Sequence, residues 1–584
     1  MKFKAYFQDE LNYLHDAGNE YSKQNPRLAK YLSDSSSDPD IQQLMEGFAF
    51  LSGRLRQTLD DELSPLTQSV LRILWSGFLA PIPPISMIKF TPDDRAITKN
   101  HHIRAGMGVC TGRLKDNVYF FETTSHCDIY PLEVHSSRLE RSQDRSALFI
   151  RFSTLSGLPL SETGLNNLRL WLIGSHLTAN TMFLWLNEYL QYISLSGHGK
   201  PSQKIPPGYL KPAGFEPTEA LLPGQKNAFD KYRILQEYFA FPQKFRCIDL
   251  SGLEPYFINC HAQEFTLEFH FNRPVPSEVM SSENIYQLYC TPAVNLTRKS
   301  SKAFSIDTMQ SLYPLEIEAN TEEHSEIFSV EAIQSWEDNS SVRSDLKPYH
   351  ALVHQIEPLS DRRQIYYREH MVSRQIHAGF DHAIEFLYHN GFPAYPRSRN
   401  LSAKLLCFNP DAHYHVDNGD ISIPTQDSPS FAHFNNFTVP TKTLYPSFDD
   451  GIHWKLISNL SQNIMHITDA ASLNKILEIF DYPARNDRIA EHQSSERLKG
   501  IISLETTPID RLFQGQPRRG IQSVLKVKGS AFSNLGEMYL FSTILSEFFA
   551  LYATQNSFHQ LKVTDIETDE TFVWAPQQGC QPLL

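Results

Sequence analysis

The chain has 584 residues, of which 41% are hydrophobic and 20% are charged, a composition typical of a globular protein and not of a disordered one. Its formal net charge of -13 argues against a nucleic-acid-binding protein, which usually carries a basic surplus. The 7 cysteines are odd in number and have no CxxC spacing, which favours reduced thiols over a disulfide framework. A prior of about 150 residues per domain predicts three or four domains.

We expect neither an export signal at the N-terminus nor a membrane-spanning helix further along the chain. "MKFKAYFQDELNYL" carries charges where a signal peptide needs an apolar core. The best candidate for a membrane span, "WSGFLAPIPPISMI", is short and holds three prolines, which a spanning helix does not tolerate. We therefore expect a cytoplasmic protein that does not insert directly into a membrane.

The first predicted element of interest is a helix over "DIQQLMEGFAFLSGRLRQTLDDEL", residues 40–63. Its apolar residues recur every three or four positions, and Asp38-Pro39 supplies a cap before it. Interior glycines cost about 1 kcal/mol each against alanine, so we expect them to admit a close neighbour. The predicted partner surface consists of Leu44, Gly47, Phe48, Ala49, Leu51, Gly53 and Leu55. From spacing alone, the neighbour is either another chain or the preceding helix, residues 3–24.

From about residue 85 the pattern changes to short alternating or apolar runs, which predict strands in "NVYFFETT", "ALFIRFSTL" and "NNLRLWLIG". A helix is expected over "TANTMFLWLNEYLQYI" and a shorter one over "YRILQEYFAF". Between them, the proline- and glycine-rich residues 196–226 indicate a long loop or linker.

The last third mixes strands and helices. "NLSAKLLCF" and "SVLKVKG" predict strands, "AASLNKILEIFDY" predicts a helix, and "ARNDRIAEHQSSE" indicates a polar loop. A long amphipathic helix is expected from about 534 to 554. The apolar side chains that we expect to form the core of this part are Phe541, Leu545, Phe548, Phe549 and Tyr552.

These elements define an α+β fold: an N-terminal helical segment, β-rich domains behind it, and a mixed α/β C-terminal domain. The expected boundaries are 1–90 for the helical segment, 91–265 for a β-rich domain with the linker near 196–226, 266–400 for a second β-rich domain, and 401–584 for the C-terminal domain.

One stretch resembles an enzyme motif. His413, His415 and Asp417 in "DAHYHVDNGD" have the H-x-H-x-D spacing of zinc hydrolases, but Asn418 stands where such enzymes usually have a further histidine. "SLSGHGKPS" lacks the first glycine and the Ser or Thr of a phosphate-binding loop. We therefore predict a protein that is not an enzyme and has no catalytic residues, cofactor or metal. Two alternatives remain open, a metal-dependent hydrolase and a carbohydrate-binding tail protein.

Several longer segments resemble one family in order along almost the whole chain. They are "ELNYLHDAGNEYSKQNPRLAKYL", "DPDIQQLMEGFAFLSGRLRQTLDDELSPLTQSVLRILWSGF", "LQEYFAFPQKF" at 235–245, "YCTPAVNL" at 289–296, "RRGIQSVLKVKGSAF" at 518–532 and "FFALYATQNSF" at 548–558. On these segments the chain resembles the TssF family (also called VasA or ImpG), the baseplate wedge subunits of the type VI secretion system.

The resemblance implies a structural role in a contractile injection system. In such wedges two copies of TssF assemble with one TssG, and the wedges surround a central hub that contains VgrG. TssK links the wedges to the membrane complex, and TssE connects them to the sheath. The N-terminal helices of both TssF copies join TssG in a helical bundle, and the C-terminal domain contributes to contacts between TssF copies. The resemblance thus favours another chain as the neighbour of the helix over 40–63.

Overall fold

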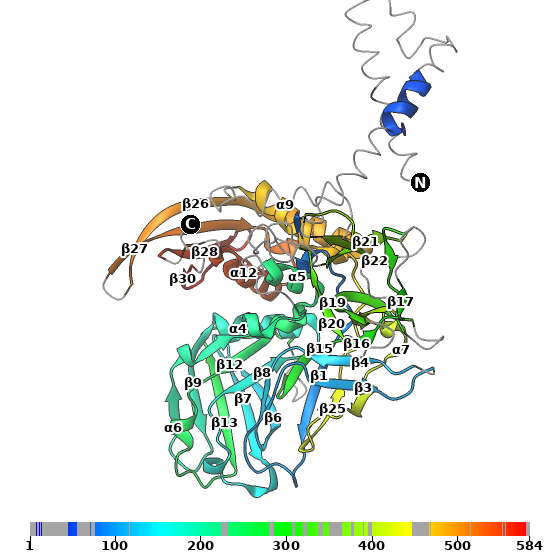
Figure 1. The fold of residues 1–584 in the computed structure, drawn as a ribbon. Helices are drawn as coiled ribbons and strands as arrows, with labels where there is room; N and C mark the ends of the chain where they lie inside the picture. The colour runs from blue at the N-terminus through cyan, green and yellow to red at the C-terminus, as the bar shows by residue number, and fades with distance from the viewer. Residues whose placement is uncertain are drawn as a thin grey trace, which may run out of the picture. The chain divides into compact units, whose positions relative to one another are not determined.

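This computed structural model describes residues 76–446 and 467–579, apart from gaps at 116, 224–231, 280–284, 306–309, 319–323, 337–342, 350–364, 375–378, 389, 395–399, 468, 514–515, 552 and 555. Before residue 76 it describes 7–8, 11, 13, 45–54 and 70–71. The chain divides into two compact units. The first contains Met1–Leu74 and Ser447–Ser458, and the second contains Trp75–Pro446 and Asn459–Leu584. Figure 1 shows the described elements, which are mixed helix and strand and rich in strand.

A six-stranded antiparallel sheet opens the second unit. Its strands, in spatial order, are β24 (Ile421–Pro424), β3 (Gly108–Thr111), β4 (Phe120–Thr123), β15 (Cys290–Val294), β1 (Ile85–Pro92) and β25 (Ala432–Asn436). The central strand β15 is buried along its whole length and comes from the segment "YCTPAVNL". Asn295, directly after it, donates to the Phe120 carbonyl of β4 and accepts from the Asn409 backbone N–H, so its side chain links this sheet to a segment near residue 409.

This sheet draws its strands from both sides of the domain boundaries expected at 265 and 400, because β1, β15 and β25 are neighbours in space. The hydrophobic pattern of a strand records that one face is buried, but it does not record which distant strand lies beside it. The domain boundaries therefore stay predictions, and this sheet is not contained within any one of the expected segments.

Two smaller antiparallel sheets follow. The five-stranded one runs β10 (Gln203–Ile205), β9 (Leu190–Ser196), β13 (Glu264–Phe271), β7 (Ser146–Thr154), β6 (Leu132–Arg141). The four-stranded one runs β11 (Leu210–Pro212), β12 (Cys247–Leu250), β8 (Leu168–Leu172), β14 (Tyr286–Gln287). The predicted strands at β7 and β8 are thereby confirmed. On β7 and β13 every second residue is buried, and the rings of Phe152 and Phe265 stack with centroids 4.9 Å apart.

Two sequence predictions in this region are wrong. The long loop or linker expected over 196–226 is wrong for its described part, residues 196–223, which includes β10, β11 and single helical turns at Pro207–Tyr209 and Pro217–Glu219. Strands of three residues are too short to show an alternating pattern, and the surrounding prolines and glycines dominate the sequence signal. The helix expected through "NEYLQYI" ends as α4 (His176–Asn187), and β9 begins at Leu190 because its residues pair with β13 instead.

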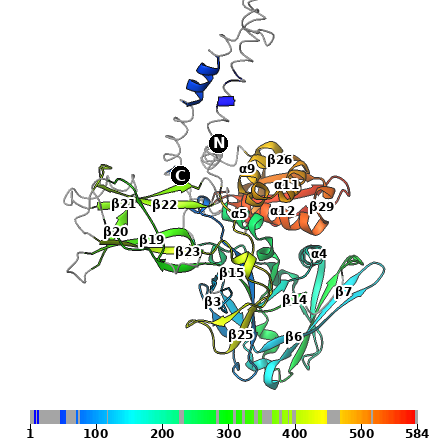
Figure 2. The ribbon, with the colours of Figure 1, turned by 90° about the vertical axis from the view of Figure 1, so that its right-hand side faces the viewer.

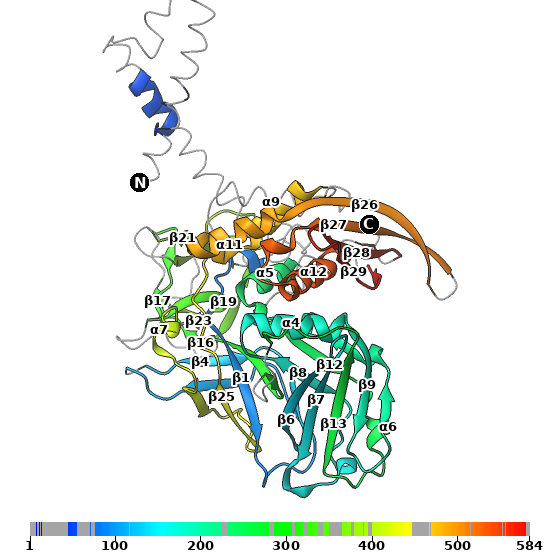
Figure 3. The same cartoon turned by 180° about the vertical axis from the view of Figure 1, so that it is seen from behind.

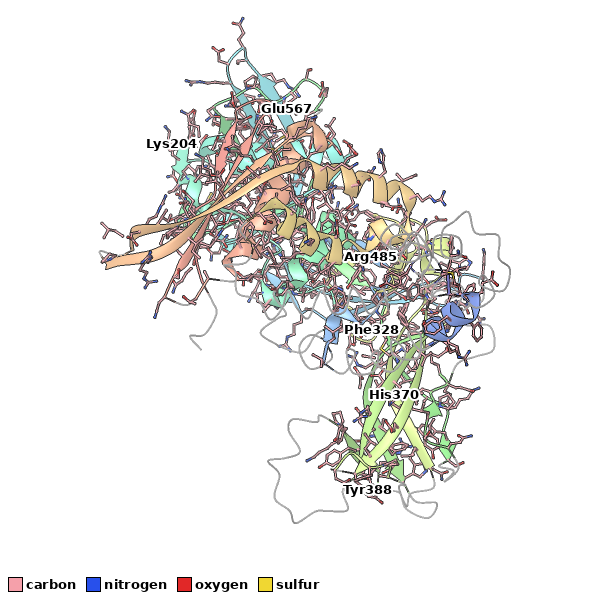
Figure 4. All side chains as sticks on the ribbon, turned by 90° about the horizontal axis from the view of Figure 1, so that it is seen from above. Lys204, Phe328, His370, Tyr388, Arg485 and Glu567 are labelled. Carbon is pink, nitrogen blue, oxygen red and sulfur yellow. The ribbon has the colours of Figure 1, made fainter. Side chains whose placement is uncertain are left out.

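An eight-stranded sheet forms a separate layer. In order its strands are β16 (Thr297–Ser300), β23 (Asn400–Phe408), β19 (Glu326–Trp336), β20 (Ser344–Pro348), β21 (Ile365–Ser373), β22 (Phe380–Tyr388) and β18 (Tyr313–Pro314), with β17 (Phe304–Ser305) paired to β23. All its pairs are antiparallel except β20 with β21. In Figure 2 it lies on the opposite side of the second unit from β6 and β7, and Figure 4 marks Phe328, His370 and Tyr388 along it. The predicted strand "NLSAKLLCF" is β23.

The C-terminal part contains a sheet with both pairing modes. Its strands are β26 (Ile501–Phe513), β27 (Gln516–Val527), β28 (Phe558–Asp565), β29 (Thr571–Val573) and β30 (Gln577–Gln578). β27 and β28 are parallel and are joined through α12 (Leu535–Ala550). β28 accompanies β27 only over residues 521–527, so the outer part of the β26–β27 hairpin continues as a two-stranded ribbon beyond the sheet, as Figure 3 shows. A further pair, β2 (His101–Ile103) with β5 (Cys127–Ile129), stands apart from the larger sheets.

Short helices surround these sheets: α5 (Arg233–Ala240), α6 (Glu254–Phe257), α7 (Ala412–His415), α9 (Ala470–Phe480), α10 (Tyr482–Asn486) and α11 (Arg488–Lys499). The predictions at α5 and α9 are confirmed. The polar loop expected over "ARNDRIAEHQSSE" is wrong, because α10 and α11 occupy it. α11 buries only Ser494 among its residues, so it shows no apolar periodicity, but Asp487 caps it by accepting from the Ile489 N–H.

Helix α12 is buried on all sides, whereas the sequence predicted an amphipathic helix. Thirteen of its 16 residues are buried. It packs against α4, α5 and β28, and the ring of Tyr539 stacks on Trp574 with centroids 5.2 Å apart. The core side chains Phe541, Leu545, Phe548 and Phe549 are at most 1% exposed, whereas Tyr552 lies outside the described residues.

A buried histidine beneath α12 makes the stability of this core depend on pH. His559 on β28 is 2% exposed, packs against Phe549, and shares a 2.9 Å hydrogen bond between its Nε2 and Ser523 Oγ. Burial lowers the pKa of His559 from 6.5 to about 4. Between these two pKa values the unfolded chain binds a proton at His559 and the folded chain does not. The neutral ring therefore contributes to the free energy of unfolding fully above pH 6.5, and this contribution is lost as the pH falls toward 4.

We expect the free energy of unfolding to fall by about 2 kcal/mol between pH 7 and pH 5 through this residue alone. Urea unfolding at the two pH values measures it, with His559→Gln as the matched protein in which this contribution is absent. The assignment is wrong if the native protein and His559→Gln lose stability equally over that interval.

Candidate interaction surfaces

The helix expected over 40–63 is described for residues 45–54, all of which are helical. The apolar side chains on it fall into two environments. Ala49 is 0% exposed and Gly53 is also buried, so residues of the same chain already cover the small side chains. Phe48 and Leu51 are 61% and 67% exposed. The helix is therefore covered by its own chain on the side of the small residues, and its large apolar side chains remain exposed to solvent.

The remaining predicted residues of this surface add one observation. Gly47 is exposed, and a Cβ at its position would meet nothing within 4 Å, so there is room for a neighbour along this part of the helix. Leu44 and Leu55 lie outside the described residues. Within the described residues, no helix combines the length and apolarity needed to cross a membrane.

The segment "LQEYFAFPQKF" forms α5 and the turn after it, and it builds a buried ionic cluster. Glu237 is 3% exposed and lies between Arg233 and Lys244, which are 8% and 2% exposed. The Arg233 Nη1 donates to both carboxylate oxygens, at 2.8 and 2.7 Å, and Lys244 Nζ donates to one of them. The Leu221 backbone N–H also donates to Glu237, at 2.7 Å.

Burial by itself would raise the pKa of Glu237, but Lys244 and Arg233 outweigh that effect and hold the pKa below its ordinary value. In this cluster two buried cations therefore share one buried carboxylate in a low-dielectric core. Its sequence signal was the i, i+4 spacing of Arg233 and Glu237, which on a helix brings opposite charges together. The third member, Lys244, comes from beyond the helix and could not be found from spacing.

The H-x-H-x-D residues do not share a strand face, because His413 and His415 lie on the single helical turn α7. The Nδ1 of His413 is 3.1 Å from the Pro410 carbonyl oxygen, and the Nδ1 of His415 is 2.9 Å from the Tyr119 hydroxyl. Across the part of the chain that the structure describes, no group of three His, Cys, Asp or Glu side chains is arranged to hold a metal ion. These contacts fix a loop against β4 and its neighbours.

The buried charges described above all pair within the chain, and the N-terminal helix exposes large apolar side chains. Both features are typical of a structural subunit in a larger assembly. Comparison with known proteins gives the family. A family model described as type VI secretion system, TssF, matches residues 1–581. The type VI secretion system component TssF1 of Pseudomonas aeruginosa is 25% identical over 627 residues, covering 99% of each chain.

Two solved structures also match. One chain, from the TssK-TssF-TssG baseplate subcomplex of the type VI secretion system, has 26% identity and a TM-score of 0.74, covering 92% of this chain and 99% of that one. Another, from the baseplate complex of the type VI secretion system, has 23% identity and a TM-score of 0.62 with 100% of both chains covered, and shows the same fold. The chain belongs to the TssF family of the type VI secretion system.

Proposed function

We propose that this chain is a wedge subunit of a bacterial type VI secretion baseplate, in which two copies assemble with one TssG and with TssK. The observation that carries the proposal is the match of the family over residues 1–581, together with the similarity to a chain of a TssK-TssF-TssG subcomplex. The further contacts with TssE and with the VgrG hub, and the docking of a cytoplasmic baseplate at the inner-membrane complex, are part of the same proposal and rest on the family resemblance.

Within this wedge, the helix of residues 45–54 supplies the apolar surface for TssG and for the second TssF copy. Support comes from the exposure of Phe48 and Leu51, since side chains of this kind, grouped on one helix, are what a helical bundle buries. Contacts between TssF copies through the C-terminal domain would use surfaces other than α12, because α12 is already enclosed. The exposed ribbon of β26 and β27, with Leu512 at 76% exposure, is the available surface there.

Leu51→Asp is expected to weaken co-purification with TssG by about thirtyfold or more, corresponding to the loss of a contact worth 2 kcal/mol or more. The aspartate would have to be buried without a partner in the complex. In the isolated chain Leu51 is 67% exposed, so the thermal transition should not change. Gly53→Leu is a poorer test because Gly53 is buried within its own chain.

Ile489→Asp is the matched control, since Ile489 lies on a helix in the C-terminal part and is 70% exposed. It should retain binding to TssG. Unchanged affinity of Leu51→Asp for TssG, or equal loss in both variants, contradicts the assignment of this helix. The mass of the native complex with TssG measures the number of TssF copies directly.

A further inference from the structure

The outer part of the β26–β27 hairpin leaves the C-terminal sheet as a ribbon of two strands (Figure 3). β28 pairs with β27 only over residues 521–527, so from Gly520 outward the two strands pair only with each other in the described structure. A two-stranded hairpin by itself is marginally stable in water. A contact with another molecule would therefore stabilise this ribbon.

The ribbon is fixed at its base. A Cβ at Gly520 would lie 2.5 Å from the ring of Phe558, so the glycine lets that ring lie against β27. The Ser557 hydroxyl donates to the Arg519 carbonyl at 2.9 Å. Because β28 and the residue before it hold the strand at this point, the residues beyond it extend as an arm of defined direction. We call residues 510–512 and 517–519 the ribbon tip.

The register of the hairpin gives the ribbon tip two different faces. Arg511 lies opposite Arg518. The next pair outward is Leu512 with Pro517. Successive residues of a strand point to opposite faces, so the two arginines share one face and the pair of Leu512 shares the other. Leu512 is 76% exposed, and Arg511 is also exposed.

The arginine face carries an excess of positive charge. Asp510 lies opposite Arg519, so that pair is balanced. Arg511 and Arg518 bring two like charges directly opposite each other, which destabilises an antiparallel pair. Toward the base, the next two pairs on the arginine face are uncharged: Ile509 with Gly520, and Thr507 with Gln522. An anionic group placed between the two arginines would replace their repulsion by attraction.

The sequence of β26 makes the addition of a further strand an unsuitable way to bind the ribbon. Pro508 has no backbone N–H to donate, and Asp510 and Arg511 place charges on the strand just after it. Proline and charged residues are means by which edge strands avoid pairing with another chain. A partner is therefore expected to contact the side chains of the ribbon tip and not its backbone.

The chemistry of the arginine face selects carboxylates of an acidic protein. Guanidinium groups bind carboxylate and phosphate in the same forked geometry. The formal net charge of -13 repels nucleic acid and anionic membranes at longer range, which disfavours phosphate. The same excess, 66 Asp and Glu against 53 Lys and Arg, makes another copy of this chain an acidic partner for a basic tip.

We propose that the ribbon tip docks on an acidic surface of a second copy of this chain, where Arg511 and Arg518 bind carboxylates and Leu512 is covered by apolar side chains. The inference specifies the contact between TssF copies that is part of the proposed function, and it rests on that function. The contact joins two different surfaces of the two copies, so it is heterologous, and it weakens as the salt concentration rises.

The test is photo-crosslinking in the complex with TssG, using the chain with Leu512 replaced by p-benzoylphenylalanine and mixed with a differently tagged native chain. Irradiation should give an adduct between the two tagged copies, with its second end in a segment rich in Asp and Glu. Adding Arg511→Glu and Arg518→Glu should lower the yield of this adduct at least about tenfold, and raising NaCl from about 0.1 M to about 1 M should also lower it.

Arg138→Glu with Arg145→Glu is the matched control, because both arginines are exposed and lie at the β6–β7 hairpin. The control should give the full yield of adduct, and both double variants should still co-purify with TssG. The inference is overturned if the TssG complex forms without an adduct between copies, or if the yield is unchanged by Arg511→Glu and Arg518→Glu. A native chain that does not bind TssG would overturn the proposed function and this inference with it.

Discussion

Glu237→Gln is expected to lower the free energy of unfolding by about 3–5 kcal/mol, because it leaves Lys244 and Arg233 buried without their counter-charge. The substitution conserves shape, so the loss measures charge and not packing. Lys244 has the more severe problem, since its side chain is 2% exposed and Glu237 is its one ion-pair partner among the described residues. The urea midpoint of the native chain and of the variant, at pH 7, measures the difference.

Two comparisons make this result specific. Glu316→Gln breaks the pair with Lys302 on the surface, where the side chains are 67% and 61% exposed, and should cost less than about 1 kcal/mol. Adding Lys244→Met to Glu237→Gln removes one of the stranded cations and should recover part of the lost stability. If Glu237→Gln is as stable as the native chain, the cluster is hydrated and the description of its burial is incorrect.

Gly536→Ala is expected to destabilise the contact between α12 and α4 by about 3 kcal/mol, at the upper end of the usual range for overpacking. A Cβ at Gly536 would lie 2.3 Å from the Asn180 carbonyl oxygen and 2.7 Å from the Thr181 nitrogen. These are backbone atoms of α4 and cannot rotate away, so the two helices would have to separate. Asn534 opposes that separation by donating to the Leu177 carbonyl at 3.1 Å.

The sign of the effect distinguishes this contact from simple helix propensity. In an open helix the change from glycine to alanine stabilises by about 1 kcal/mol, whereas here it should destabilise. Gly208→Ala is the control, because a Cβ there would meet nothing within 4 Å. Thermal melting of the three proteins measures the result, and a native-like melting temperature for Gly536→Ala would show that the two helices do not cross this closely.

The elements that could be predicted from sequence are those in which the order of apolar and polar residues follows which positions are buried and which are exposed. β7 alternates buried and less buried residues because one of its faces meets a core, and its sequence alternates accordingly. α5 and α9 carry an apolar stripe and end where Pro242 and Asp481 interrupt the helix. Polar α11 has no stripe, so its helix became evident only in the structure, although its Asp487 cap is present in the sequence.

By itself the sequence determined the family, the mixed helix and strand character, and the apolar spacing of the helix over 40–63, because these depend on residues close together in the chain. Only the tertiary structure decided which strands share a sheet, that α12 is enclosed on every side, and that Ala49 is covered while Leu51 remains open. The tertiary structure also decided that Arg169, Asp249 and Lys211 lie side by side, because the register of β8, β12 and β11 brings them together. Pairing across such distances depends on which surfaces fit together, and local sequence patterns do not record that fit.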